Sequence, residues 1–525
     1  MKPARRAPVP VYPFPAALYP VLALYAHNVD QLTPDSLLVP AFAALALAAG
    51  VLLVTRFLCG GYRRAAIPSA LFLFLFFAYG HIHMPFRQWR PAASLVSGAL
   101  LMALVAAAYV LAVLLVRRRP GARYDTATRV LNLGAALLLV VPVARTLAYE
   151  VSAPRVEGGR PGVVSPARGS DSLSPNILHL VPDRYPSEST LAEVYGYDNR
   201  SFLDELRARG FYVAEESRCN YGRTDMSLAS TLNLDYLDSL LARVERRSRR
   251  RVLYRAIQDN DAVRFLRARG YRYLHFGTSW HATSRGRNAD ANYNRLLLSD
   301  FGMMLYRTTM AYPVGALVGF DAHREQWARV RYKFDMLESL DTVPGPVFAF
   351  AHFLVPHEPY VLNRDGEFVD RLAQMRQGTR AGFVEQVEYV NRRMLALVDN
   401  LLDDDSPRSW VIILQSDEGP HPPENFEHRD SLQTLRAKFR ILNAWYLPGG
   451  DADLLHPAIS PVNTFRVLFN RYFDADMNLL PDRSFFIRGD VWREVTGLVE
   501  YRRGEPPRSA VLSQPGLTRI GVSLD

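Results

Sequence analysis

Cysteine is almost absent from this chain, which has two cysteines, Cys59 and Cys219, among 525 residues. Cys59 lies beside an apolar segment and Cys219 lies in the later, more polar part, so we expect no disulfide between them. No cysteine pair has the spacing of a zinc site. The sequence therefore excludes a disulfide-rich scaffold and a metal site held by cysteines.

Three further features are missing. The N-terminus lacks a single short apolar core followed by a small-residue cleavage site, so we expect no cleavable signal peptide. The formal net charge is +10, but no basic run is interleaved with aromatic residues, so we expect no nucleic-acid partner. The apolar segments also lack the buried charges that mark the substrate path of a transporter.

Long apolar segments dominate the first 150 residues, whereas the rest has the composition of a soluble domain. A bilayer core requires about 20 apolar residues in a helix. Four such helices in a row would overload the core of a soluble domain. We predict five spans, at residues 12–27, 37–57, 67–84, 92–116 and 129–149.

Basic residues flank these segments unevenly. They are dense before the first span, after the second (Arg63, Arg64) and after the fourth (Arg117, Arg118), and sparse in the other connections. The positive-inside rule then places the N-terminus inside and everything beyond residue 150 outside. We predict a membrane domain of about five helices over 1–150, a linker over 151–174 that is rich in Gly, Pro and Ser, and an outer domain over 175–525.

The outer domain alternates apolar runs with helical patterns. Strands are predicted at 176–181, 211–214, 347–354, 410–414 and 441–447, and a long helix at 380–402. Continuous apolar strands separated by helices predict an α/β domain with a mostly parallel central sheet. Ligands bind such sheets beyond the carboxyl ends of the strands.

Polar residues follow three of these strands. Asp183 follows the first, His357 the third, and Asp417-Glu418 the fourth, while Thr224 precedes a helical run. Acidic groups brought together at strand ends are ligands for a hard divalent cation. Each of these residues alone is equally compatible with a helix cap or a turn.

Four patches, in this order, resemble the sulfatase and alkaline-phosphatase superfamily in its membrane-anchored bacterial branch, which is similar to lipoteichoic-acid synthases and phosphoethanolamine transferases. The resemblance covers roughly residues 175–485. The patches are Pro175–Leu178 leading into Asp183, Asn220–Ser230 around Thr224, His352–Tyr360 around His357, and Ser416–Gly419.

The resemblance implies an α/β domain of alkaline-phosphatase/sulfatase-like type and a divalent metal ion, namely Mn, Mg, Ca or Zn. The implied metal ligands are Asp183, Thr224, Asp417 and Glu418. Thr224 would be the nucleophile, and His357 would be both catalytic and substrate-binding.

Two departures from the family pattern bear on the chemistry. Threonine stands where a sulfatase has the Cys or Ser that becomes formylglycine, which points toward phosphoryl transfer and away from sulfate cleavage. Glu418 stands where the family usually has His. His421 is then a candidate for the missing imidazole, as a substrate-binding or metal-site residue.

The expected function is transfer or hydrolysis of a phospho-group on a cell-envelope lipid or glycan, by a multi-pass protein of the bacterial inner (plasma) membrane whose catalytic domain lies in the periplasm or outside the cell. Two alternatives stay open: a sulfate or phosphate ester hydrolase, and an inactive glycan-binding or scaffold protein.

Residues 301–320 are unusually apolar, with Arg307 as the only charge. We interpret them as either an interfacial segment or a buried helix pair.

Overall fold

In the computed structural model the chain divides into two compact units. The N-terminal unit comprises Met1–Ala153 and Leu297–Ala322, and the sheet unit comprises Pro154–Leu296 and His323–Asp525. The structure describes residues 7–89, 94–152, 175–242, 244–295, 298–403, 409–421, 431–449, 453–488 and 491–499. The predicted linker lies almost wholly outside these ranges.

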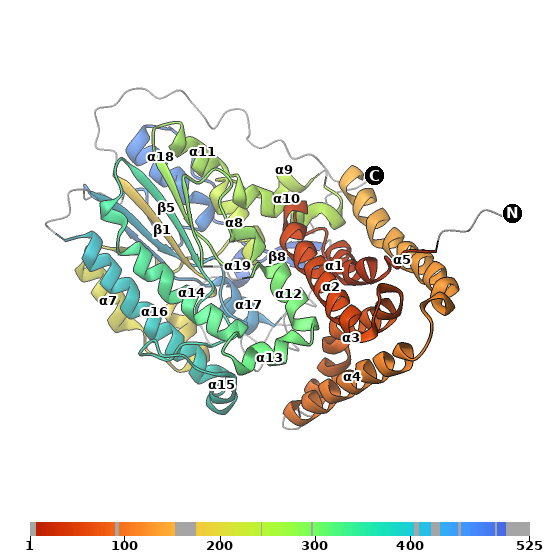
Figure 1. The fold of residues 1–525 in the computed structure, drawn as a ribbon. Coiled ribbons are helices and arrows are strands. Elements are labelled where there is room, and N and C mark those ends of the chain that lie inside the picture. The colour runs from red at the N-terminus through yellow and green to blue at the C-terminus, as the bar shows by residue number, and fades with distance from the viewer. Residues whose placement is uncertain are drawn as a thin grey trace. The chain divides into compact units, whose positions relative to one another are not determined.

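The N-terminal unit is helical (Figure 1). Its helices are α1 (Pro13–His27), α2 (Leu38–Cys59), α3 (Tyr62–Trp89), α4 (Ser94–Arg117), α5 (Asp125–Ser152), α12 (Asp300–Thr308) and α13 (Ala311–Leu317). Within the described ranges, four helical segments are long and apolar enough to cross a membrane: Pro34–Cys59, Tyr62–Met84, Val96–Arg117 and Asp125–Ser152. These four match the second to fifth predicted spans.

The first predicted span forms α1, whose 15 residues fall short of the length that a bilayer core requires. It is nevertheless buried along its length. Tyr12, just before α1, packs with Cys59 and Ala65, next to the arginine-rich turn between α2 and α3. Tyr25 packs with Phe77 at the other end of the bundle. α1 therefore runs from the arginine-rich end to the opposite end, which we call the far end.

The sheet unit contains, in its described part, one sheet of seven strands in the order β2-β7-β6-β1-β5-β3-β4. The run from β6 to β4 is parallel, and β7 is antiparallel to both of its neighbours. The mostly parallel sheet predicted from the sequence is confirmed. The strands are β1 (Asn176–Pro182), β2 (Tyr212–Val213), β3 (Arg272–Phe276), β4 (Ala291–Tyr293), β5 (Val347–Phe353), β6 (Trp410–Gln415) and β7 (Asn443–Tyr446).

Both faces of this sheet are buried, which explains why its strands are continuously apolar. In β1, Leu178 and Leu180 face one core, while Ile177 and Val181 face the other. The first core is covered by α7 (Arg200–Ala208), α14 (Ala322–Leu337) and α16 (Thr379–Leu401), and the second by α8 (Thr224–Leu232), α10 (Arg246–Gln258), α11 (Asp261–Arg267) and α18 (Thr464–Phe473) (Figure 1).

Smaller elements complete the sheet unit. They are the helices α6 (Glu188–Thr190), α9 (Asp238–Leu241), α15 (Arg371–Gln377), α17 (Leu432–Phe439) and α19 (Thr496–Val499), and a hairpin of β8 (Phe485–Arg488) and β9 (Val491–Glu494). The predicted long helix at 380–402 is α16, and it is confirmed within one residue at each end.

The register of the sheet gathers polar residues at one edge. Val181 of β1 lies opposite His352 of β5, and Leu180 lies opposite Leu414 of β6. Because all three strands are parallel, Asp183 after β1, His352 near the end of β5 and Asp417 after β6 meet at the carboxyl edge.

We predict that Gly419→Ala destabilises the sheet unit. A Cβ at Gly419 would lie 1.9 Å from the Ala437 carbonyl oxygen, a backbone atom with little freedom to move. The resulting shift should cost about 1–3 kcal/mol and lower the melting temperature. Gly497→Ala is the control, because nothing lies within 4 Å of a Cβ there. Thermal unfolding of the full chain in detergent measures both, and equal melting temperatures would contradict the prediction.

Candidate metal centre and nucleophile

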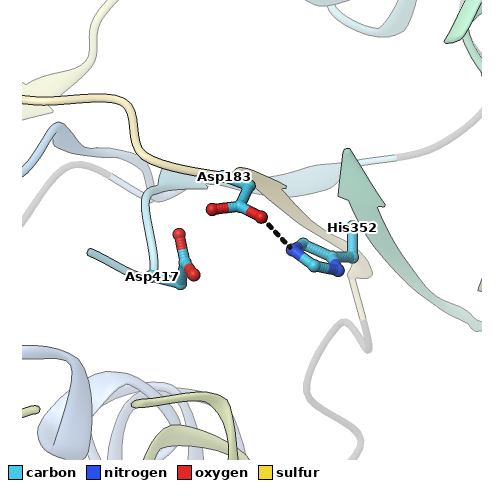
Figure 2. Close-up of side chains that lie close together, drawn as sticks. All are labelled: Asp183, His352 and Asp417. Atoms are coloured by element: carbon cyan, nitrogen blue, oxygen red, sulfur yellow. Dashed lines mark ion pairs between the residues drawn. The ribbon is translucent and has the colours of Figure 1, made fainter. Parts of the chain in front are cut away.

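Three buried side chains converge at the carboxyl edge of the sheet. Asp183 is the first residue after β1, His352 is the sixth residue of β5, and Asp417 lies two residues beyond β6. One ligand atom from each lies within 4.8 Å of the other two (Figure 2). Two carboxylates and one imidazole at this spacing form a set that can hold a divalent metal ion.

Each of these three side chains has a buried polar atom without a hydrogen-bond partner. Among the residues that the structure describes, Asp183 Oδ1, His352 Nε2 and Asp417 Oδ2 are buried without a hydrogen bond. Buried polar atoms are bonded in most proteins, so three such atoms in one place require an explanation. A cation bound between them would satisfy all three, and the residues therefore fit a metal ion.

The orientation of His352 favours a ligand role. Thr283 Oγ1 lies 2.9 Å from its Nδ1, which leaves Nε2 facing Asp183 Oδ2 at 3.9 Å. Burial, followed by the nearby Lys333, holds the pKa of His352 well below its usual range. The imidazole is therefore neutral at pH 7 and carries a lone pair for a metal.

Negative charge is concentrated around Asp183. Burial raises the pKa of Asp183 to about 7, with Arg184 opposing this shift and Glu418 adding to it. Burial and the Asp183 carboxylate likewise raise the pKa of Asp417 well above its usual range. Two carboxylates with raised pKa values side by side are a site where positive charge binds favourably.

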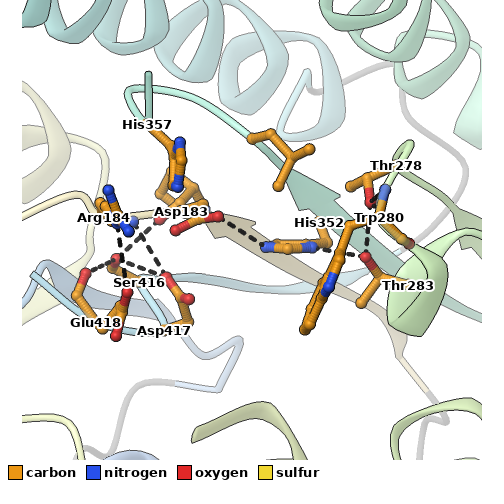
Figure 3. A network of polar contacts seen from close by, with 12 residues as sticks. Asp183, Arg184, Thr278, Trp280, Thr283, His352, His357, Ser416, Asp417 and Glu418 are labelled. Carbon is orange, nitrogen blue, oxygen red and sulfur yellow. Dashed lines mark hydrogen bonds and ion pairs between the residues drawn. The ribbon is translucent and has the colours of Figure 1, made fainter. Parts of the chain in front are cut away.

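Two cations, Lys438 and Arg184, partly compensate this charge; Figure 3 shows Arg184 beside the carboxylates. Lys438 Nζ lies 2.5 Å from Glu418 Oε1, and Arg184 Nε lies 3.4 Å from the same oxygen. Arg184 Nη1 also pairs with Glu358 at 2.9 Å. When Asp183, Asp417, Glu418 and Glu358 are all ionised they face these two cations, which leaves two negative charges for a divalent ion to neutralise.

Ser416 and Arg184 hold the two aspartates in place. Ser416 Oγ accepts a hydrogen bond from Tyr185 N at 2.9 Å and lies 2.8 Å from the Pro182 carbonyl oxygen, so it joins the ends of β6 and β1. Arg184 has a left-handed backbone conformation, with φ of 63°. Its N–H donates to Asp417 Oδ1 at 3.1 Å.

Thr224 lies on a helix, α8, whereas the three clustered residues lie on or just after strands of the sheet. It is the first residue of α8, and Arg223 occupies the capping position, so Thr224 is not the N-cap. Its hydroxyl lies close enough to Asp417 to lower the pKa of that carboxyl. The partial positive charge at a helix N-terminus also favours negative charge that develops on the threonine oxygen.

The two remaining predicted histidines, His357 and His421, lie outside the three-residue cluster. Burial, followed by Arg184, lowers the pKa of His357, and its Nδ1 donates to the Glu358 carbonyl oxygen. Its side chain stays 26% exposed, so solvent or substrate can reach it. His421 is half-buried and is not part of the three-residue cluster.

The structure therefore brings together Asp183, Asp417 and Thr224, three of the residues singled out in the sequence, and their catalytic and metal-binding roles stay predictions. Glu418 is adjacent, but its Oε1 is engaged by Lys438 and Arg184, and its role as a metal ligand stays a prediction. Sequence reasoning did not identify His352 as a ligand. The available signal was a lone histidine inside the otherwise apolar strand β5.

Similar solved structures include members of the group that the sequence motifs resemble. No protein-family model matches this chain, and no curated protein matches it. The zinc complex of the periplasmic domain of EptC from Escherichia coli is 12% identical, with a TM-score of 0.41, and the match covers 68% of this chain and 96% of that one.

Two other structures are similar at the same level. The integral membrane lipooligosaccharide phosphoethanolamine transferase A from Neisseria meningitidis is 13% identical, with a TM-score of 0.39, and the match covers 87% of this chain and 95% of that one. A protein in the alkaline phosphatase superfamily from Vibrio parahaemolyticus is 12% identical, with a TM-score of 0.40 and coverage of 65% and 80%. Similarity at this level does not by itself assign a reaction to this chain.

We predict that metal binding and pH are linked through Asp183. Its carboxyl ionises near pH 3.8 in the unfolded chain and near pH 7 in the folded, metal-free chain. The stability that this difference provides is present below pH 3.8 and is lost as the pH rises through 7, by at most about 4 kcal/mol. Because a cation binds the ionised form, Mn²⁺ should raise the melting temperature more at pH 8 than at pH 5.

Thermal unfolding with chelator or with Mn²⁺ measures this linkage. Asp183→Asn should weaken both the fall in stability with pH and the effect of Mn²⁺. Asp365→Asn is the control, because Asp365 is an exposed acid whose ion pair with Arg392 lies on the surface. A pH profile of Asp183→Asn that matches the unsubstituted chain would exclude Asp183 from the site.

Proposed function

We propose that this protein is a membrane-bound, divalent-metal-dependent phosphotransferase that uses Thr224 as its nucleophile and acts on a phosphodiester of a cell-envelope lipid or glycan. The observation that carries this proposal is the position of Thr224, the first residue of α8, whose hydroxyl lies beside Asp417, one of the three buried residues that converge as a candidate metal site. An alcohol at the edge of a cation site and at a helix N-terminus is placed for activation as a nucleophile.

Asp183, His352 and Asp417 would hold the ion. When bound, a divalent ion lowers the pKa of a neighbouring hydroxyl and screens the charge of a phosphate. The Thr224 oxygen forms a bond to phosphorus while the bond from phosphorus to the leaving alcohol breaks, and a water molecule protonates the leaving oxygen. The proton of the Thr224 hydroxyl passes to the neighbouring Asp417, which returns it to the Thr224 oxygen when that oxygen is displaced in the second half-reaction. The product of this half-reaction is a phosphodiester on Thr224.

His357 would handle the proton of the second half-reaction. The Glu358 carbonyl oxygen can only accept a hydrogen bond, so the ring proton of neutral His357 stays on Nδ1. Nε2 then has a free lone pair. It can take the proton of the entering hydroxyl, either of water or of an acceptor sugar or lipid, as that hydroxyl displaces Thr224 from phosphorus.

The N-terminal unit supports a lipid-linked substrate. Four helical segments in the described residues are long and apolar enough to cross a membrane, so the same chain that carries the site is anchored at a lipid surface. The arginine-rich turns after α2 and α4 favour a cytoplasmic location for that end of the bundle. α5 then leads the chain to the far side, which is the periplasm of a bacterial inner membrane.

The first test is the intact mass of the full-length protein after incubation with phosphatidylethanolamine or phosphatidylglycerol vesicles and a divalent ion. We expect an adduct whose mass names the transferred group, and release of diacylglycerol. Thr224→Ala should abolish the adduct and slow diacylglycerol release at least about 1,000-fold, because the variant lacks the hydroxyl that forms the bond to phosphorus.

Two variants serve as controls for that test. Thr224→Ser keeps the hydroxyl and should keep the adduct. Ser227→Ala removes a hydroxyl from the same helix, one turn further on, and should leave the adduct in place. Undiminished diacylglycerol release by Thr224→Ala would show that Thr224 is not the nucleophile.

A further inference from the structure

Residues 298–320 leave the sheet unit and form part of the helical bundle. β4 ends at Tyr293 in the sheet unit. α14 begins at Ala322, the last residue of the N-terminal unit, and continues in the sheet unit from His323. Between them, α12 packs Phe301 and Leu305 into the same cluster as Tyr25 and Phe77, at the far end of the bundle. The segment predicted as either interfacial or buried is therefore a buried helix, α12, followed by α13.

The depth of this contact can be read along α3. Met310 N donates a hydrogen bond to the Phe76 carbonyl oxygen at 2.9 Å. Phe76 lies 14 residues after Tyr62, the first residue of α3, and Gly80 lies 18 residues after it. At 1.5 Å per residue these positions are about 21 and 27 Å from the arginine-rich end. A hydrocarbon core is about 30 Å thick, so the turn between α12 and α13 contacts α3 within that thickness.

Gly80 permits this contact. A Cβ at Gly80 would lie 2.5 Å from Thr308 Cα, so the backbones of α3 and α12 approach too closely for any side chain there. Small residues at close helix contacts are characteristic of packing inside membranes, where backbones meet without a hydrophobic driving force.

α13 presents an apolar edge. Val314, Leu317 and Val318 are 49%, 80% and 78% exposed. Tyr306 holds the turn beneath them, since its hydroxyl lies within hydrogen-bond distance of the Ala311 and Phe320 carbonyl oxygens. An apolar edge that follows a contact with α3 at this depth matches acyl chains, whereas in water these three side chains would be an unprotected apolar patch.

We propose that residues 298–320 are a hairpin embedded in the leaflet at the far end of the bundle, with Val314, Leu317 and Val318 against lipid. This role is independent of the proposed reaction. The sheet unit is then fixed to the membrane at a second place besides residues 153–174, so that its attachment does not depend on the linker alone.

The direct test is fluorescence quenching on the full chain in liposomes. Both native cysteines are buried, so a cysteine placed at Leu317 can be labelled selectively with an environment-sensitive fluorophore. Leu138→Cys, on α5, is the lipid-facing control, and Leu372→Cys, on α15 of the sheet unit, is the aqueous control; both positions are exposed.

We expect the label at 317 to be quenched by doxyl-phospholipids as strongly as the label at 138, and by aqueous iodide at least about five-fold less than the label at 372. Val318→Cys should behave in the same way. Iodide quenching at 317 equal to that at 372 would overturn the proposal.

A second measurement uses a protease site placed in the linker of the full chain. After cleavage in liposomes, the sheet unit should remain in the membrane pellet through a high-salt wash. Gly80→Ala should release more of it than Gly134→Ala, since nothing lies within 4 Å of a Cβ at Gly134. Complete release of the unsubstituted sheet unit would show that the hairpin is not embedded.

Discussion

The feature on which this structure depends is the burial of Asp183 and Asp417 beside each other at the carboxyl edge of the sheet. Burial is the main cause that raises both pKa values, and neighbouring carboxylates, Glu418 beside Asp183 and Asp183 beside Asp417, add to it. Lys438 and Arg184 form ion pairs with the neighbouring Glu418 and Glu358, and they oppose the rise of the Asp183 pKa only in part. The remaining charge can be removed either by protons, at a cost to stability that depends on pH, or by a divalent cation. The chemistry that we propose follows from binding of the divalent cation.

The rest of the sheet unit serves to keep these groups in place. Parallel strands set three side chains from distant parts of the chain at one edge, and the Ser416 hydroxyl ties the ends of two of those strands together. Thr283 fixes the ring of His352 from behind. α8 places the Thr224 hydroxyl beside Asp417, at the positive end of the helix. A site this rigid loses little free energy when it orders an ion or a phosphate.

Much of this architecture could be predicted because it depends on local patterns. Continuous apolar runs identified the strands, and acids placed directly after them identified Asp183 and Asp417. Contacts across the sheet were out of reach: His352 is recognisable only once the register sets it opposite Val181, and Lys438 only once α17 lies beside Glu418. The residues at 298–320 were ambiguous because an apolar stretch of that length suits a core and a membrane equally, and only the packing against α3 distinguishes them.

The central claim is that Asp183, His352, Asp417 and Thr224 share one divalent ion. Anomalous diffraction from crystals of the full chain grown with Zn²⁺ tests it most directly. We expect a single strong peak among these four side chains, with ligand distances of about 2.0–2.2 Å. A peak bound by Glu418 but not by Asp183, or no peak at this edge of the sheet at saturating Zn²⁺, would contradict the account.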